Sequence, residues 1–140
     1  MKLPVIFLLH PVGIGATRAM NVLSTKLWIR ALVDLLQDVA IAAPWLPYAE
    51  VMVDRERGLR DSLAFAADCH GAVACGGEFS RGMGPEWDLF VQLKRPRIDL
   101  TRPPMPAILT YEGFGVTHAA KFREAVTDAF SILVPSEVAA

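Results

Sequence analysis

The sequence has no hydrophobic run long enough to cross a membrane. Its apolar stretch near the N-terminus, from Lys2 to Leu9, is too short for a bilayer span and for the hydrophobic region of a signal peptide. Cysteine is also scarce, because Cys69 and Cys75 cannot make the several cross-links of a secreted disulfide framework. These absences predict a cytoplasmic protein with no membrane partner.

Clustered positive charge is missing as well. The formal net charge is −1, and the nearest approach to a basic run, Lys94–Arg97, is typical of a helix end that enters a loop. A surface that neutralises nucleic-acid phosphates needs clustered Lys and Arg, so the sequence argues against a nucleic-acid partner. With 53% hydrophobic and 21% charged residues over 140 positions, the chain has the composition of one globular domain.

What the sequence does contain is an alternation of short apolar runs with amphipathic segments, which is typical of a parallel α/β sheet. The predicted strands cover residues 5–9, 39–43, 71–75 and 107–111. We therefore expect a single three-layer α/β domain over residues 1–134, followed by a tail at 135–140. Its parallel sheet should have about five strands in a flavodoxin-like or Rossmann-like arrangement.

Helices are expected between these strands. Their predicted spans are about 17–36, 59–67, 86–94 and 117–130. Two segments are predicted to be irregular: residues 45–57, which Pro47 interrupts, and residues 94–106, which contain four prolines.

Ligands of open parallel sheets bind at the carboxyl ends of the strands, so the segments that follow the strands hold the candidate site. Asp61, near the start of the second helix, can project over the same edge. The other candidates are His10, Gly13, Gly15 and Arg18 after the first strand, Trp45 and Tyr48 after the second, and Ser80–Glu86 after the third. Two readings stay open here: the His10–Pro11 step can be purely structural, and Trp45 and Tyr48 can stack a nucleobase or lie at a subunit contact.

The segment Ser80–Glu86 joins a predicted buried strand to a predicted helix. Its glycines permit a tight turn and a close approach of the backbone to a ligand. Pro85 suits the first helical position, and Glu86 then lies in the first turn, where the helix dipole favours its ionised form. An ionised carboxylate beside a glycine-lined cavity can act as a nucleophile, although an acid at this position can also simply help the helix to start.

Two carboxylates at one site suit glycosyl chemistry. Cleavage of an N-glycosidic bond builds positive charge on the anomeric carbon, which a carboxylate such as Glu86 stabilises or attacks. A second acid, here Asp61, can assist the departing base or bind a sugar hydroxyl. A metal is not expected, because Cys69, His70 and Cys75 lack a second pair of ligands.

The pattern Ser80-x-Gly82-x-Gly84-x-Glu86 resembles the S/D-x-G-x-G-x-E signature of the nucleoside 2-deoxyribosyltransferase-like superfamily. The run from Ile6 to Pro11 is similar to the opening strand and turn of that family. The resemblance covers roughly residues 5–90 and implies that Glu86 is the glycosidic nucleophile.

The first signature position carries information on the substrate. The resemblance implies that an acid there holds a free 5'-hydroxyl, whereas serine is found in the branch that hydrolyses nucleoside 5'-monophosphates. A hydroxyl and glycine N–H groups bind a phosphate that a carboxylate would repel. The phosphate contacts expected here are Ser80, Gly82, Gly84 and the Gly13–Gly15 loop, with Arg18 adding charge, and Met83 is expected to contact the substrate as well.

The chain also departs from the family pattern. Phe7 stands where the family often has a tyrosine, His70 where it has an acid, and Trp87-Asp88 where most members have a glycine at the second position. The Trp45–Tyr48 and Cys69–Val73 segments look more like those of an uncharacterised subgroup of the family than like those of its studied enzymes. Because Phe7 lacks the hydroxyl of that tyrosine, we hypothesise that it contacts the substrate and leaves room for a ribose 2'-hydroxyl.

The sequence therefore predicts hydrolysis or transfer at the N-glycosidic bond of a nucleoside 5'-monophosphate, a small-molecule partner. No metal or organic cofactor is required, and the resemblance implies a homo-oligomer. Two alternatives remain: a non-catalytic nucleotide-binding module on the same fold, and an NAD-cleaving glycohydrolase.

Overall fold

The computed structural model describes residues 3–101, which form an α/β fold around a parallel sheet. Within this part of the chain the sheet has four strands in the order β2-β1-β3-β4, a flavodoxin-like arrangement. The strands are β1 (Val5–Leu9), β2 (Ala40–Ala42), β3 (Gly71–Ala74) and β4 (Arg97–Asp99). The expected strand at 107–111, the helix at 117–130 and the tail at 135–140 lie outside the described residues.

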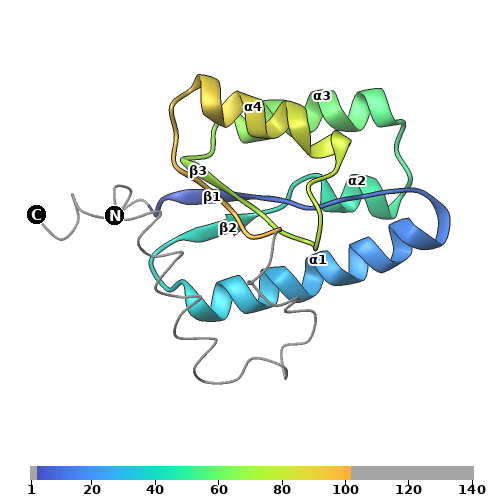
Figure 1. Ribbon diagram of the computed structural model, residues 1–140, viewed down its shortest axis with the longest axis horizontal. Coiled ribbons are helices and arrows are strands. Elements are labelled where there is room, and N and C mark those ends of the chain that lie inside the picture. The colour runs from blue at the N-terminus through green and yellow to red at the C-terminus, as the bar shows by residue number, and fades with distance from the viewer. Residues whose placement is uncertain (1–2, 102–140) are drawn as a thin grey trace, which may run out of the picture.

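Helices cover both faces of the sheet (Figure 1). Helix α1 (Gly15–Leu35) lies on one face, and α3 (Arg55–Ala66) and α4 (Gly84–Gln92) lie on the other. The short helix α2 (Leu46–Glu50) follows β2, and the 3₁₀ turn η1 (Arg81–Met83) leads into α4. The predicted three-layer α/β architecture is confirmed, and none of the described helices is long and apolar enough to cross a membrane.

The first strand explains why two separate cores form. Successive side chains of a strand point to opposite faces, so β1 divides its apolar residues between the layers. Ile6 and Leu8 pack with Trp28 of α1, whereas Phe7 and Leu9 belong to the cluster on the α3–α4 side. A strand buried on both faces is apolar throughout, which is why the sequence shows it plainly.

Two predicted loops contain regular structure. Residues 45–57 were expected to be irregular because of Pro47, yet Pro47 lies in the first turn of α2, where its missing N–H leaves no helical bond unmade. Residues 94–106 were expected to form a loop, yet 97–99 form β4, which pairs with β3 through Ala72↔Arg97. With Ile98 as its one apolar residue, β4 has no pattern of its own and depends on its neighbour in the sheet.

Gly76, just after β3, is held against the end of β1. Its φ is +108°, and a Cβ built on it would lie 2.7 Å from both His10 Nε2 and Pro11 Cδ. The next residue, Gly77, also has a positive φ of +86°, but a Cβ there meets nothing within 4 Å. The two glycines therefore share a backbone conformation that favours glycine and differ in crowding.

We expect Gly76→Ala to lower the free energy of unfolding by about 2–4 kcal/mol, because the new methyl group clashes with a buried ring as well as straining the backbone. The matched control Gly77→Ala should lower it by only about 1 kcal/mol. Urea unfolding midpoints of the two variants measure the difference. Equal midpoints would mean that His10 and Pro11 move aside freely.

Candidate functional site

The candidate site lies at the carboxyl ends of β1 and β3, which are neighbours in the sheet with Leu9 opposite Ala74. The two glycine-containing segments that follow these strands are therefore adjacent, as the close approach of Gly76 to His10 also shows. This is the edge at which open parallel sheets bind ligands.

His10 holds β1 against α1. It is buried; its Nδ1 lies 2.8 Å from the Pro11 carbonyl oxygen and its Nε2 lies 2.8 Å from Ser24 Oγ. The carbonyl can only accept, so Nδ1 carries the proton and Nε2 accepts from the Ser24 hydroxyl. Burial lowers the pKa of His10, which favours this neutral form. Both ring nitrogens are thus engaged within the protein, and the arrangement matches the structural reading of the His10–Pro11 step.

The first glycine loop is braced by α1. Gly13 and Gly15 have φ values of +71° and +57°, a conformation that glycine adopts readily. Arg18 Nε donates to the Gly13 carbonyl at 3.1 Å, and Asn21 Nδ2 donates to the Val12 carbonyl at 3.1 Å. Arg18 therefore stabilises the loop through its hydrogen bond to the Gly13 carbonyl.

The second loop, Ser80–Glu86, runs through η1 directly into α4. Met83 is buried, and its Sδ accepts from the Ser80 backbone N–H at 3.3 Å, so Met83 anchors the turn from the core. A Cβ on Gly82 would lie 3.2 Å from Nη2 of Arg55, the first residue of α3. The glycine thus makes room for a guanidinium group over the turn.

Glu86 lies in the first turn of α4 with its carboxyl group turned toward α3. Ser62 Oγ donates to Glu86 Oε2 at 3.0 Å, and Ser62 is itself buried. Burial raises the pKa of Glu86 to about 7, against the opposite effect of the Ser62 hydrogen bond. At neutral pH the carboxyl group therefore exists in both forms.

Asp61 has the opposite environment, although it precedes Ser62 on the same helix. Arg57 Nε and the Tyr48 hydroxyl each donate to Oδ2 at 2.9 Å, and Arg60 Nε donates to Oδ1 at 3.0 Å. The hydrogen bonds from Arg57 and Tyr48, with a smaller one from Arg60, lower the pKa of Asp61 to about 2. Asp61 is therefore ionised at neutral pH, a state that suits an acceptor and not a proton donor.

Two of the predicted aromatic and apolar contacts lie in the core. The Trp45 indole is buried and donates through Nε1 to the Leu8 carbonyl at 2.7 Å. Phe7 is fully buried against Phe90, with ring centroids 6.0 Å apart. Neither ring presents a stacking face at the edge of the sheet, and Tyr48 directs its hydroxyl to Asp61.

A different aromatic pair flanks the signature segment. Phe79 precedes Ser80 and Trp87 follows Glu86, and their rings meet edge to face with centroids 5.3 Å apart. The Arg97 guanidinium carbon lies 5.8 Å from the centroid of the Trp87 ring. The signal was present in the sequence as two aromatic residues bracketing the motif.

Ser62 and Arg55 are the other residues that sequence patterns did not indicate. A lone serine within a helix and an arginine at its first position carry no motif, and their relation to Glu86 and Gly82 arises only when α3 packs beside α4. Within residues 3–101 no three His, Cys, Asp or Glu side chains gather closely enough to hold a metal ion.

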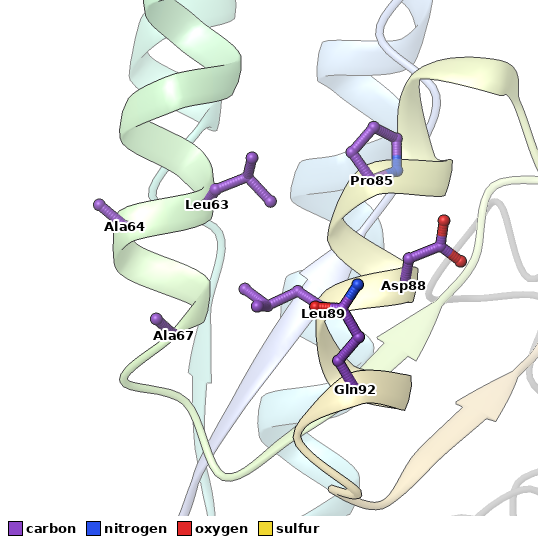
Figure 2. A pocket seen from close by; sticks show the side chains of 7 residues that line it. All are labelled: Leu63, Ala64, Ala67, Pro85, Asp88, Leu89 and Gln92. Atoms are coloured by element: carbon purple, nitrogen blue, oxygen red, sulfur yellow. The ribbon is translucent and has the colours of Figure 1, made fainter.

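An open groove lies between α3 and α4 (Figure 2). Its volume is about 610 Å³, and its lining is Leu63, Ala64, Ala67, Pro85, Asp88, Leu89 and Gln92. Pro85 lines this groove, whereas the next residue, Glu86, contacts Ser62. Glu86 itself is not among the residues that line the groove.

Comparison with known proteins finds no family model and no curated protein that matches the chain.

Proposed function

We propose that this protein cleaves the N-glycosidic bond of a nucleoside 5'-monophosphate with Glu86 as the nucleophile. The observation that carries the proposal is the buried Glu86 carboxyl group at the carboxyl edge of the sheet, held by Ser62 and with a pKa of about 7. A carboxyl group in a protein cleft whose ionisation is poised near neutral pH is typical of catalytic acids, bases and nucleophiles.

In this mechanism the Glu86 carboxylate attacks the anomeric carbon as the bond to the base breaks. The base leaves with a proton taken from water, and the sugar phosphate remains as an ester of Glu86. A second water molecule then cleaves the ester and returns the proton. Asp61, ionised and oriented by Arg57 and Tyr48, accepts a hydrogen bond from the base or a sugar hydroxyl. No cofactor takes part.

The substrate phosphate is assigned to the turn of Ser80, Gly82 and Gly84 and to the Gly13–Gly15 loop. Arg55 supports this assignment, because its guanidinium group lies over Gly82 and, within the described residues, has no hydrogen bond or ion pair. Arg55 also begins α3, where the helix dipole disfavours a cation, so a bound phosphate would relieve an unfavourable position.

A cytoplasmic location and a homo-oligomeric state belong to the same proposal. Helix α1 leaves Met20 and Leu23 exposed, and Val51 and Met52 are exposed after α2. Contiguous patches of exposed apolar side chains mark surfaces that contact another chain, and these residues are the candidates for such a patch.

The first experiment measures base release from a panel of ribo- and deoxyribonucleoside 5'-monophosphates, the matching nucleosides and NAD. We expect release from at least one monophosphate and little from its nucleoside. Release from NAD alone would support a dinucleotide glycohydrolase. Binding of nucleotides without any release would instead identify a non-catalytic nucleotide-binding module.

Arg55→Gln tests the phosphate contact. We expect KM for the monophosphate to rise about 10- to 100-fold, because a charge-assisted hydrogen bond to an anion is lost, with turnover of the matching nucleoside unchanged. Lys26→Gln removes the same charge from α1, where Lys26 pairs with Glu50, and should leave KM unaltered. Equal loss on nucleoside and monophosphate would place Arg55 outside the phosphate site.

A further inference from the structure

Ser62 is a polar residue on a helix face that is otherwise built of small apolar groups. Ser62 and Ala66 are the buried residues of α3, and Cys69 continues the same face beyond its end. Alanine would fill this position with a better helix propensity and no buried polar atom. The hydroxyl is therefore unexplained by packing alone.

The hydrogen bond of the Ser62 hydroxyl joins helix α3 to helix α4. A serine inside a helix commonly bonds back to the carbonyl of its own preceding turn, but Ser62 Oγ donates instead to Glu86 Oε2 on α4, 24 residues further along the chain. Within residues 3–101 this is the hydrogen bond found at the Glu86 carboxyl group, so Oε2 is occupied and Oε1 is left for another partner.

We propose that Ser62 is a positioning residue that fixes the Glu86 carboxylate so that Oε1 faces the anomeric carbon. This inference rests on the proposed function, since it gives the nucleophile of that reaction its orientation. A carboxylate with one oxygen held rotates less about its terminal bond, so the attacking oxygen spends more of its time in line with the bond that breaks.

The hydrogen bond also affects ionisation, because a hydroxyl that donates to a carboxylate favours the charged form. It acts against the burial that raises the pKa of Glu86 to about 7. The charged groups near this edge come from three elements. They are Arg55, Arg57, Arg60 and Asp61 on α3, Arg81 on η1, and Asp88 on α4.

None of these charged groups has a hydrogen bond or ion pair with Glu86 in the described part of the chain. The Ser62 hydroxyl is the group that bonds directly to the Glu86 carboxylate. Asp61 is paired with Arg57 and Arg60, and Asp88 is exposed and lines the α3–α4 groove. Arg55 lies over Gly82, and Arg81 is exposed.

The test compares Ser62→Ala with Ser62→Thr, which restores a hydroxyl. On the best monophosphate, Ser62→Ala should lower kcat about 10- to 100-fold with KM nearly unchanged, the range expected for a lost hydrogen bond to a charged group. The acidic limb of its pH–rate profile should move about one pH unit higher. Ser62→Thr should recover most of kcat and return the limb toward its original position.

Thr25→Val provides the matched control. Thr25 is a fully buried hydroxyl on α1, on the opposite side of the sheet, and donates to the Asn21 carbonyl. Its removal should leave kcat and the acidic limb unchanged even if stability falls.

A second readout follows the carboxyl group without turnover. The ¹³C signal of the Glu86 side-chain carbonyl, titrated by NMR, should have a higher midpoint in Ser62→Ala than in the parent. A parent enzyme that turns over substrate, with neither kcat nor either midpoint altered in Ser62→Ala, would overturn the positioning role alone. Absence of base release by the parent from every substrate would overturn the proposed function instead.

Discussion

Replacing Glu86 by glutamine is expected to lower base release at least about 10³-fold at pH 8 while leaving substrate binding intact. An amide is not a nucleophile toward the anomeric carbon and cannot form the glycosyl ester. The substitution keeps the size of the side chain, and the amide oxygen can still accept from the Ser62 hydroxyl, so the site should keep its shape. The measurement is the ratio of kcat between variant and parent, together with nucleotide affinity from calorimetry.

Asp88→Asn on the same helix is the control for this experiment. Asp88 is exposed and lines the α3–α4 groove, so its neutralisation should change kcat by less than about twofold. Acid quenching of the parent during turnover should also leave a sugar phosphate on the peptide that contains Glu86, detectable by mass spectrometry. Substantial activity in Glu86→Gln would assign the nucleophile to a different residue.

The helices and strands that could be predicted from sequence are those that their own local sequence pattern specifies. The strand at 5–9 and the long helix after it are confirmed, because an unbroken apolar run and a long segment without glycine or proline need no distant partner to be recognised. By contrast, β4 exists because β3 offers it an edge, and α2 was obscured by a proline that in fact lies in its first turn. Local pattern therefore predicted β1, β2 and β3 and missed β4.

The candidate site divides in the same way. Glu86 could be singled out because the glycine turn, the proline and the helix start are adjacent in sequence. Ser62 could not, since its meaning depends on a carboxyl group 24 residues away. The pairing of Asp61 with Arg57 was within reach, because residues four apart lie on one helix face. The burial of Trp45 could not be predicted, because an aromatic residue that follows a strand is equally compatible with the core and with a ligand contact.

The ionisation of Glu86 should also make the protein's stability depend on pH. The folded-state pKa is raised from 4.5 to about 7, so between these values the folded chain binds more protons than the unfolded chain. The free energy of unfolding therefore falls as pH rises through this window and levels off above it. A pKa shift of this size lowers the free energy of unfolding by about 3 kcal/mol, and the full decrease is reached above pH 7.

Glu86→Gln should remove this loss, because an amide does not titrate. The variant and the parent should unfold with similar free energies at pH 4.5, and the variant should be more stable by up to about 3 kcal/mol at pH 8. Urea unfolding of both proteins at pH 4.5, 6 and 8 measures the difference. A difference that stays constant across this range would contradict a buried, titrating Glu86.

The difference between the two proteins isolates Glu86 from the other titrating groups. Asp61, whose pKa is lowered to about 2, contributes stability that is present above its ordinary pKa and lost as pH falls toward 2. His10, whose pKa is lowered by burial, contributes stability that is lost as pH falls below its ordinary value. Both effects occur equally in parent and variant and cancel. A carboxylate that destabilises the fold at the pH where it is ionised has no structural reason to be there, so a stabilising but inactivating Glu86→Gln would show that position 86 is occupied for chemistry rather than for folding.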